Sequence, residues 1–207
     1  MTIMGNVFCF ESLDSTNSKA ISMAKEGLNE GVIVASRQTG GRGRMGRSFA
    51  SPRGGLYLSY LTDRLKGGAA VLALTPAAAL AVRRAILRTY GLSCGIKYPN
   101  DLLLENRKVC GILCESVSCG ERFSVVIGAG INVCSDVPLP EDAPAYPPGA
   151  LKDFCEKAED PRSLQELERN LIEELGAVID TFAAGGSLNE AEYRRYCVNC
   201  PETIVHF

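Results

Sequence analysis

The sequence of 207 residues has no tryptophan and one histidine, and no run approaches the roughly 18 apolar residues that a membrane-spanning helix needs. Its first residues also lack a basic segment followed by an apolar core, so no signal peptide is predicted. Hydrophobic residues make up 46% of the chain and charged residues 22%, which is typical of globular proteins. We therefore expect a cytoplasmic protein with no membrane partner.

Ligands for a structural metal are also scarce. The nine cysteines, in a chain without a signal peptide, are expected to be free thiols. Cys197 and Cys200 form one Cys-x-x-Cys pair, but there is no second pair, and His206 alone does not complete the four ligands of a zinc site. We expect no structural zinc. The net charge of −2 and the lack of an extended basic stripe also argue against a DNA partner.

What the sequence does contain is a segment rich in glycine and arginine, Gln38–Pro52. Five arginines and no acidic residue fall between Gly31 and Thr62, so the rest of the chain sums to −7, which is −2 minus +5. Glycine lets the backbone approach a ligand closely, and arginine offers a fork of donors to phosphate or carboxylate. The segment predicts a site for a small anionic ligand; the alternative is a solvated basic loop.

Hydrophobic periodicity predicts an α+β fold. Helices are expected over residues 18–26, 72–90, 163–182 and 188–196, and strands over 7–13, 31–36, 55–61, 95–98, 101–104, 109–117 and 123–134. Pro76 would lie near the start of its helix, where the first turn tolerates proline. Consecutive hairpins with helices set to one side favour a mixed, largely antiparallel sheet over a doubly wound one.

The spacing Gly41-x-Gly43-x-x-Gly46 matches the sequence of a dinucleotide-binding fingerprint but not its structural context. That fingerprint requires a helix after the glycines, whereas a predicted strand follows here. A protein-kinase loop would be followed by His-Arg-Asp and Asp-Phe-Gly, and neither is present. Any phosphate would therefore be held by arginine side chains and loop amides.

A second polar cluster is the run Lys97-Tyr98-Pro99-Asn100-Asp101. A lysine fixed at a strand end could stabilise the charge on a transferring phosphoryl or acyl group, and Asp101 could help to hold Mg²⁺. The alternative is a turn with a surface lysine. Downstream, Gly111 and the pair Gly128 and Gly130 lie inside predicted strands, a pattern that often marks close approach of a ligand.

Six blocks together, in this order, resemble the biotin–protein ligase family over about residues 7–196. They are Asp14–Asn17, Gln38–Arg47, Ser51–Ser59, Lys97–Asp101, Lys108–Glu115 and Gly128–Val133. The resemblance implies a biotin/lipoyl ligase fold of the class II synthetase type. It also implies that biotin and ATP, with Mg²⁺, give biotinyl-5′-AMP. The biotinyl group would then pass to a lysine of a biotin carboxyl carrier domain.

The resemblance also implies roles for particular residues, with Lys97 and Arg44 as the catalytic pair. The residues expected to contact biotin or its adenylate are Ser15, Thr16, Asn17, Gln38, Gly41, Arg42, Gly43, Arg44, Lys97, Gly111 and Ile112. Those expected near the nucleotide and metal are Asn100, Asp101 and Asn132. Simpler structural roles are open for some of them: Ser15 and Thr16 could be helix caps, and Gly111 a packing glycine.

The chain departs from the family pattern in several places. Phe49 and Tyr98 stand where the family usually has tryptophan, and both keep an aromatic surface. No N-terminal helix-turn-helix domain is expected, so a repressor role is not predicted. Residues 1–196 are expected to form the catalytic domain, and 197–207 the remnant or start of a small C-terminal β-barrel.

Two other functions and one assembly stay open at this stage. One function is a lipoate or octanoate ligase, which the arginine-rich segment disfavours. The other is a protein that binds biotin or biotinyl-AMP without transferring it. An exposed strand edge would also permit a homodimer.

Overall fold

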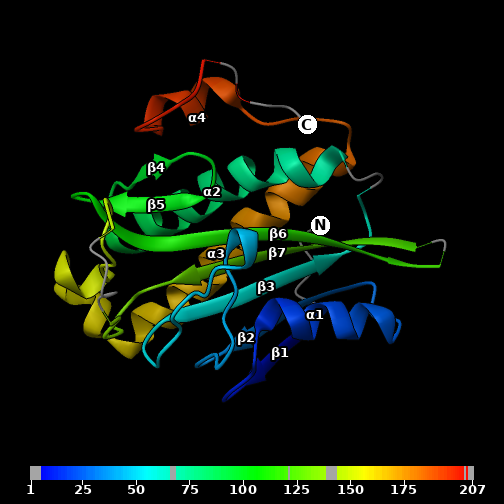
Figure 1. Ribbon diagram of the computed structural model, residues 1–207, viewed down its shortest axis with the longest axis horizontal. Helices are drawn as coiled ribbons and strands as arrows, with labels where there is room; N and C mark the ends of the chain where they lie inside the picture. The colour runs from blue at the N-terminus through cyan, green and yellow to red at the C-terminus, as the bar shows by residue number, and fades with distance from the viewer. Residues whose placement is uncertain (1–5, 66–68, 121, 139–143, 203, 205–207) are drawn as a thin grey trace.

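The computed structural model describes residues 6–65, 69–120, 122–138, 144–202 and 204 (Figure 1). Their centre is a seven-stranded sheet in the order β1-β2-β3-β7-β6-β5-β4. The strands are β1 (Val7–Phe10), β2 (Glu30–Ala35), β3 (Leu56–Thr62), β4 (Gly95–Lys97), β5 (Asp101–Leu104), β6 (Arg107–Cys119) and β7 (Arg122–Ile131). Only β1 and β2 pair in parallel; every other neighbouring pair is antiparallel, which confirms the predicted α+β class with a mixed sheet.

The described helices are α1 (Thr16–Lys25), α2 (Ala69–Tyr90), α3 (Pro161–Ala183) and α4 (Glu190–Tyr196), with short 3₁₀ turns at Arg44–Gly46, Leu151–Asp153 and Glu156–Glu159. Helix α3 begins where the sequence signals it: Asp160 caps it by accepting from the Arg162 amide, and Pro161 occupies the first turn. Its apolar stripe is buried against the core.

The prediction for Pro76 was wrong. Helix α2 begins at Ala69, so Pro76 lies inside the helix and not in its first turn. Proline removes one backbone donor from a helix interior. Here Leu74 and Ala78 on either side are completely buried, and the burial of this face offsets the lost hydrogen bond.

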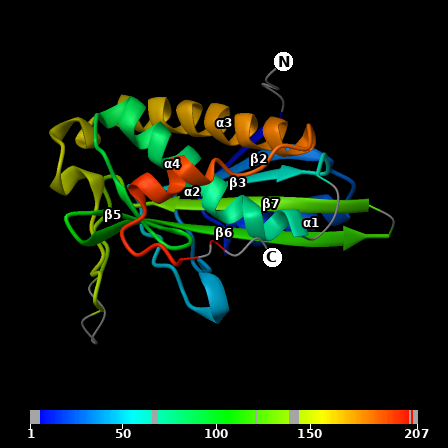
Figure 2. The same cartoon turned by 90° about the horizontal axis from the view of Figure 1, so that it is seen from above.

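Helices cover both faces of the sheet, which corrects the expectation that they lie to one side. In β7, Ile127 and Ile131 belong to the larger core with α2 and α3, whereas Val126 packs with Ala20 and Ala24 of α1 on the opposite face. Figure 2 shows α3 on one side of the sheet and the loop that contains Arg44–Gly46 hanging from the other. The α1 face therefore carries a helix over only part of its width, next to that loop.

The two edges of the sheet differ. Beyond β4, the amide of Val198 donates to the carbonyl of Ile96 at 2.9 Å, so the C-terminal segment covers that edge. At the β1 edge, Val7 is 45% exposed. Among the described residues, no helix combines the length and apolarity that crossing a membrane requires.

Candidate functional site

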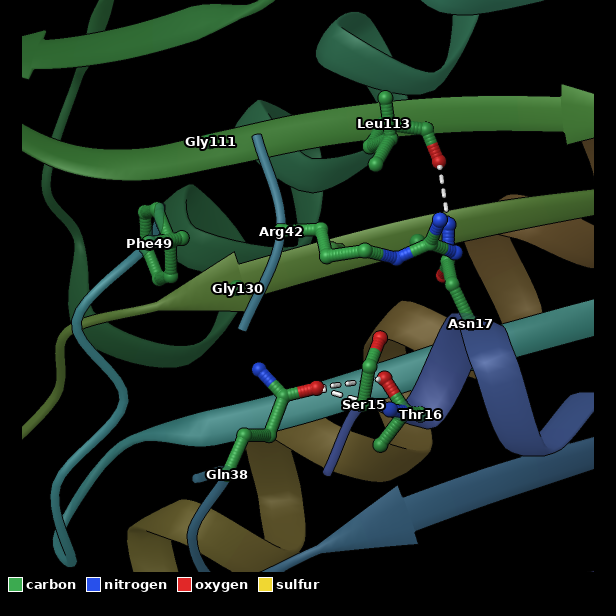
Figure 3. Close-up of a pocket in the computed structure, with 11 residues that line it drawn as sticks. Ser15, Thr16, Asn17, Gln38, Arg42, Phe49, Gly111, Leu113 and Gly130 are labelled. Carbon is green, nitrogen blue, oxygen red and sulfur yellow. Dashed lines mark hydrogen bonds between the residues drawn. The ribbon is translucent and has the colours of Figure 1, made fainter. Parts of the chain in front are cut away.

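The floor of the candidate site is a stretch of sheet without side chains. Gly111 on β6 and Gly128 and Gly130 on β7 occupy the α1 face of neighbouring strands (Figure 3). A Cβ at Gly128 would lie 2.2 Å from Oδ1 of Asn17, and one at Gly130 would lie 2.6 Å from the Phe49 ring. Only glycine permits these approaches, as expected where something packs directly on the backbone of a strand.

Polar groups from the start of α1 line one wall of this floor. Ser15 caps the helix, and Thr16 and Asn17 follow it, all three at most 4% exposed. The Oε1 atom of Gln38 accepts from the Thr16 amide at 2.8 Å and from its hydroxyl at 3.1 Å. Ser59 on β3 lies within 2.8 Å of the Thr16 hydroxyl and 2.6 Å of Asn17 Oδ1. These bonds fix the direction of each donor and acceptor, as selective recognition requires.

Glu115 joins this wall to the loop, and the sequence reasoning did not single it out. Its Oε2 atom accepts from Asn17 Nδ2 at 2.8 Å and from Arg42 Nη2 at 2.7 Å. Asn17 Nδ2 also lies 3.1 Å from the carbonyl of Leu113. The available signal was periodicity, because Glu115 lies four residues after Gly111 and therefore on the same face of the strand.

The segment Gln38–Pro52, called the lid from here on, forms a narrow hairpin-like loop. The Gly43 amide donates to the Arg47 carbonyl at 2.7 Å, and the Phe49 amide donates to the Gly41 carbonyl at 2.8 Å. At its tip, Met45 has a φ of 56° and is 91% exposed. These cross-loop bonds tie the two arms of the lid together.

Packing and a hydrogen bond also attach the lid to the sheet. The Phe49 ring packs on Gly111 and Gly130. At the base of the lid, the hydroxyl of Tyr57 donates to the carbonyl of Pro52 at 2.6 Å. Burial raises the pKa of Tyr57, so its phenol keeps this donor across the physiological pH range.

The predicted lysine cluster lies beside the lid and includes a lysine that was not predicted. Nζ of Lys97 lies 3.7 Å from Oδ2 of Asp101, and Nζ of Lys108 lies 2.8 Å from Oδ1 of the same carboxylate. Lys97 also lies over the Tyr146 ring, 5.1 Å from its centroid. From the lid, Nη1 of Arg44 reaches Oδ1 of Asn100 at 3.4 Å.

Lys97 and Lys108 border a cavity of about 690 Å³. Its lining includes Arg47, Phe49, Lys97, Asp101, Lys108, Asn132 and Tyr146. A smaller space of about 130 Å³ between Arg44, Asn100 and Gly111 lies between this cavity and the glycine floor. The arrangement offers a polar, side-chain-free slot beside a larger compartment with positive charge and an aromatic surface.

The structure places the other predicted residues as follows. Gly41 has no room for a side chain, because a Cβ there would lie 2.3 Å from the Phe49 carbonyl oxygen. The Ile112 side chain is 1% exposed in the core that faces α2, so the prediction that it lies along a ligand fails for the side chain. Strand alternation explains this, because Ile112 must face away from Gly111. Only its backbone is near the site, where its carbonyl accepts from Asn100 Nδ2 at 2.9 Å.

The described residues include no group of three or more His, Cys, Asp or Glu side chains placed to hold a metal ion. Both carboxylate oxygens of Asp101 face a lysine ammonium. Asn132 is 3% exposed and donates to the Gly149 carbonyl at 3.0 Å, but its buried Oδ1 has no protein partner. These oxygens are too few to enclose a metal ion by themselves. They fit better a cation that phosphate groups already chelate.

Comparisons with known proteins agree with this geometry. Residues 9–132 match the model of the biotin/lipoate A/B protein ligase family. A biotin–[acetyl-CoA-carboxylase] ligase of Paracoccus denitrificans is 35% identical over 82% of this chain and 72% of that protein. The bifunctional ligase/repressor BirA of Salmonella typhimurium is 37% identical over 62% of this chain, which spans 41% of that longer protein.

A solved structure, the biotin protein ligase of Aquifex aeolicus in complex with biotin and ATP, superposes with a TM-score of 0.76 at 25% identity. The match covers 94% of this chain and 79% of that protein.

Proposed function

Because the chain belongs to the biotin/lipoate A/B protein ligase family, we propose that it is a biotin–protein ligase. It activates biotin with ATP to biotinyl-5′-AMP and passes the biotinyl group to a lysine of a biotin carboxyl carrier domain. The observation that carries this proposal is the glycine floor, which is walled by the start of α1, covered by an arginine lid and continuous with a lysine-lined cavity.

The slot over the glycine floor suits the fused rings of biotin. Its polar wall, with Thr16, Asn17 and Gln38, offers donors and acceptors to the ureido group. The backbone of Gly111 and the Phe49 ring would enclose the apolar part. The valeryl carboxylate then points towards Arg44 and Lys97, and the cavity beside them takes the nucleotide.

In the first step, a carboxylate oxygen of biotin attacks the α-phosphorus of ATP and pyrophosphate leaves. Lys97 and Arg44 stabilise the negative charge that develops on the α-phosphoryl oxygens. Mg²⁺ would arrive with the nucleotide and neutralise phosphate charge, and Asp101 and Asn132, which line the same cavity, would help to hold it. The closed lid keeps water from the mixed anhydride until the amine of the carrier lysine attacks its carbonyl and AMP leaves.

The test is to incubate the protein with biotin, MgATP and a carrier domain, and to measure pyrophosphate release and the mass of the carrier. We expect one biotinyl group on one lysine. Lys97→Ala should abolish adenylate formation, whereas Lys25→Ala, at an exposed position on α1, should not. Adenylate without transfer would favour a biotin-binding protein, and use of lipoate in place of biotin would favour the lipoate branch. If the protein forms neither the biotin adenylate nor the lipoate adenylate, the proposal is refuted.

We further propose that residues 1–196 are the catalytic domain and that the protein works in the cytoplasm. The β1 edge, where Val7 is 45% exposed, could pair with a second copy of the chain. Light scattering at several protein concentrations, with and without biotin, measures whether a homodimer forms.

A further inference from the structure

The segment Tyr193–Cys200, called the clasp from here on, holds the strand that carries Lys97. The amide of Val198 donates to the carbonyl of Ile96 at 2.9 Å, and Cys197 pairs with Ile96 as a parallel bridge. Val198 also covers Gly95, where a Cβ would lie 2.8 Å from its methyl group. The clasp therefore adds a single β-bridge at the β4 edge, one residue before Lys97.

The clasp also holds the turn after Lys97. The amide of Tyr98 donates to Oδ1 of Asn199 at 2.7 Å, and the buried hydroxyl of Tyr193 donates to the carbonyl of Pro99 at 3.1 Å. Both neighbours of the lysine are thus fixed by one short segment of the C-terminal part of the chain. Among the described residues, the Lys97 ammonium contacts the Asp101 carboxylate at 3.7 Å and the Tyr146 ring, so its position depends on this backbone support.

Two thiols border the part of the clasp that makes these bonds. Cys197 and Cys200 lie on either side of Val198 and Asn199, and both are free, half-buried thiols packed against the edge of the core. Nη1 of Arg194 donates to Sγ of Cys200 at 3.7 Å, which holds the Cys200 side chain beside the end of α4. Burial raises the pKa of the Cys197 thiol.

We propose that Cys197 and Cys200 are a reversible dithiol–disulfide site that controls how firmly the clasp holds the Lys97 turn. The oxidant is a small disulfide of the glutathione type. The Cys200 thiolate attacks one sulfur of the oxidant and releases one thiolate, which gives a mixed disulfide. The Cys197 thiolate then attacks Sγ of Cys200 and releases the second. The protein thiols lose two electrons and two protons in total, and the small disulfide is reduced to two thiols.

The disulfide would loosen the turn because Asn199 and Val198 lie inside the ring that it closes. A disulfide joins the two sulfur atoms at about 2.05 Å and so restricts the backbone between them. We expect this restriction to displace the Val198 amide and the Asn199 carboxamide, which hold Ile96 and Tyr98. Loss of the hydrogen bond to Tyr98 alone corresponds to about a two- to tenfold change in the population of the held turn.

The structural part of this proposal is tested without any activity measurement. The full chain is equilibrated with oxidised or reduced glutathione, and peptide mass analysis locates a loss of two hydrogens. We expect a Cys197–Cys200 disulfide that dithiothreitol reverses, together with faster hydrogen exchange at the Tyr98 amide. Cys200→Ser should show neither change. A disulfide elsewhere, glutathione that stays attached to one thiol, or unchanged exchange at Tyr98 would overturn the proposal.

The effect on catalysis rests on the proposed ligase function and is measured separately. Oxidation should lower the rate of adenylate formation about two- to tenfold with little change in biotin affinity, and Asn199→Ala should do the same in the reduced protein. Cys9→Ser, at an exposed thiol on β1, should respond to oxidation as the unaltered protein does. A fully active oxidised protein would refute the link to Lys97. Absence of ligase activity in both redox states, with the exchange change intact, would refute the proposed function alone.

Discussion

Replacing Gly130 by alanine tests whether the lid closes by laying Phe49 on bare backbone. The new Cβ would lie 2.6 Å from one ring carbon of Phe49 and 3.1 Å from two others. Carbon atoms in contact are normally about 3.5 Å or more apart, so the ring must retreat by about 0.9 Å. Gly130 does not adopt a positive φ, so backbone strain does not add to the effect.

The magnitude follows from where the ring sits. Overpacking usually costs about 1–3 kcal/mol, and a half-buried ring on a loop can move, so we expect the lower end, about 1–1.5 kcal/mol. The cost falls on the closed state of the lid, which corresponds to about a five- to tenfold loss of biotin affinity. Thermal stability without ligand should change little, because the lid can open to relieve the contact.

Biotin affinity is measured by calorimetric titration of Gly130→Ala, Phe49→Ala and the double variant. This double-mutant cycle separates the effect of the Phe49 ring on binding from other effects of the Gly130 substitution. In the Phe49→Ala background, Gly130→Ala should weaken binding by less than about threefold, because the ring is gone. Gly40→Ala is the matched control in the same loop, since its Cβ would meet nothing closer than 3.5 Å. If Gly130→Ala weakens binding equally in both backgrounds, the lid does not close through this contact.

Three other predictions concern the site and the core. Lys97→Met should slow pyrophosphate release at least about a hundredfold while calorimetry shows nearly unchanged biotin binding, because one charge-stabilising donor is lost. Asn17→Ala should lower the free energy of unfolding by about 1–3 kcal/mol in chemical denaturation and weaken biotin binding, because buried partners lose their hydrogen bonds. Burial raises the pKa of Cys94 and Cys114 from 9.0 to about 12. Neither thiol should therefore react with iodoacetamide at pH 8 until the protein unfolds, whereas the exposed Cys9 should react. Alkylation of Cys94 in the folded protein would contradict this prediction. Because these folded-state pKa values are raised, their stabilisation is complete below about pH 9 and should be lost in denaturation curves as the pH rises towards 12.

The local structure of the site could be predicted from the sequence. Ser15 is the cap of a helix, and Gly111 and Gly130 leave bare strand surface, as their spacing indicated. These features depend on neighbours in the chain, so pattern and propensity reveal them.

Features that depend on which strands pair were not predictable in the same way. Glu115 acquires its role because β6 passes Asn17 of α1 and because the lid brings Arg42 to it. Lys108 reaches Asp101 because β5 and β6 are neighbours. Ile112 was assigned to the site by resemblance to the family motif, and strand alternation places its side chain on the face opposite Gly111.

Strand β6 contributes alternate residues to the site and to the core, and this limits how its length can vary. Gly111 and Glu115 belong to the site, while Cys110 and Ile112 belong to the core. Inserting or deleting one residue between Gly111 and Glu115 would exchange the two sets, placing a carboxylate in the core and an aliphatic side chain in the biotin slot. This stretch should therefore accept substitutions among apolar residues but no change in residue count.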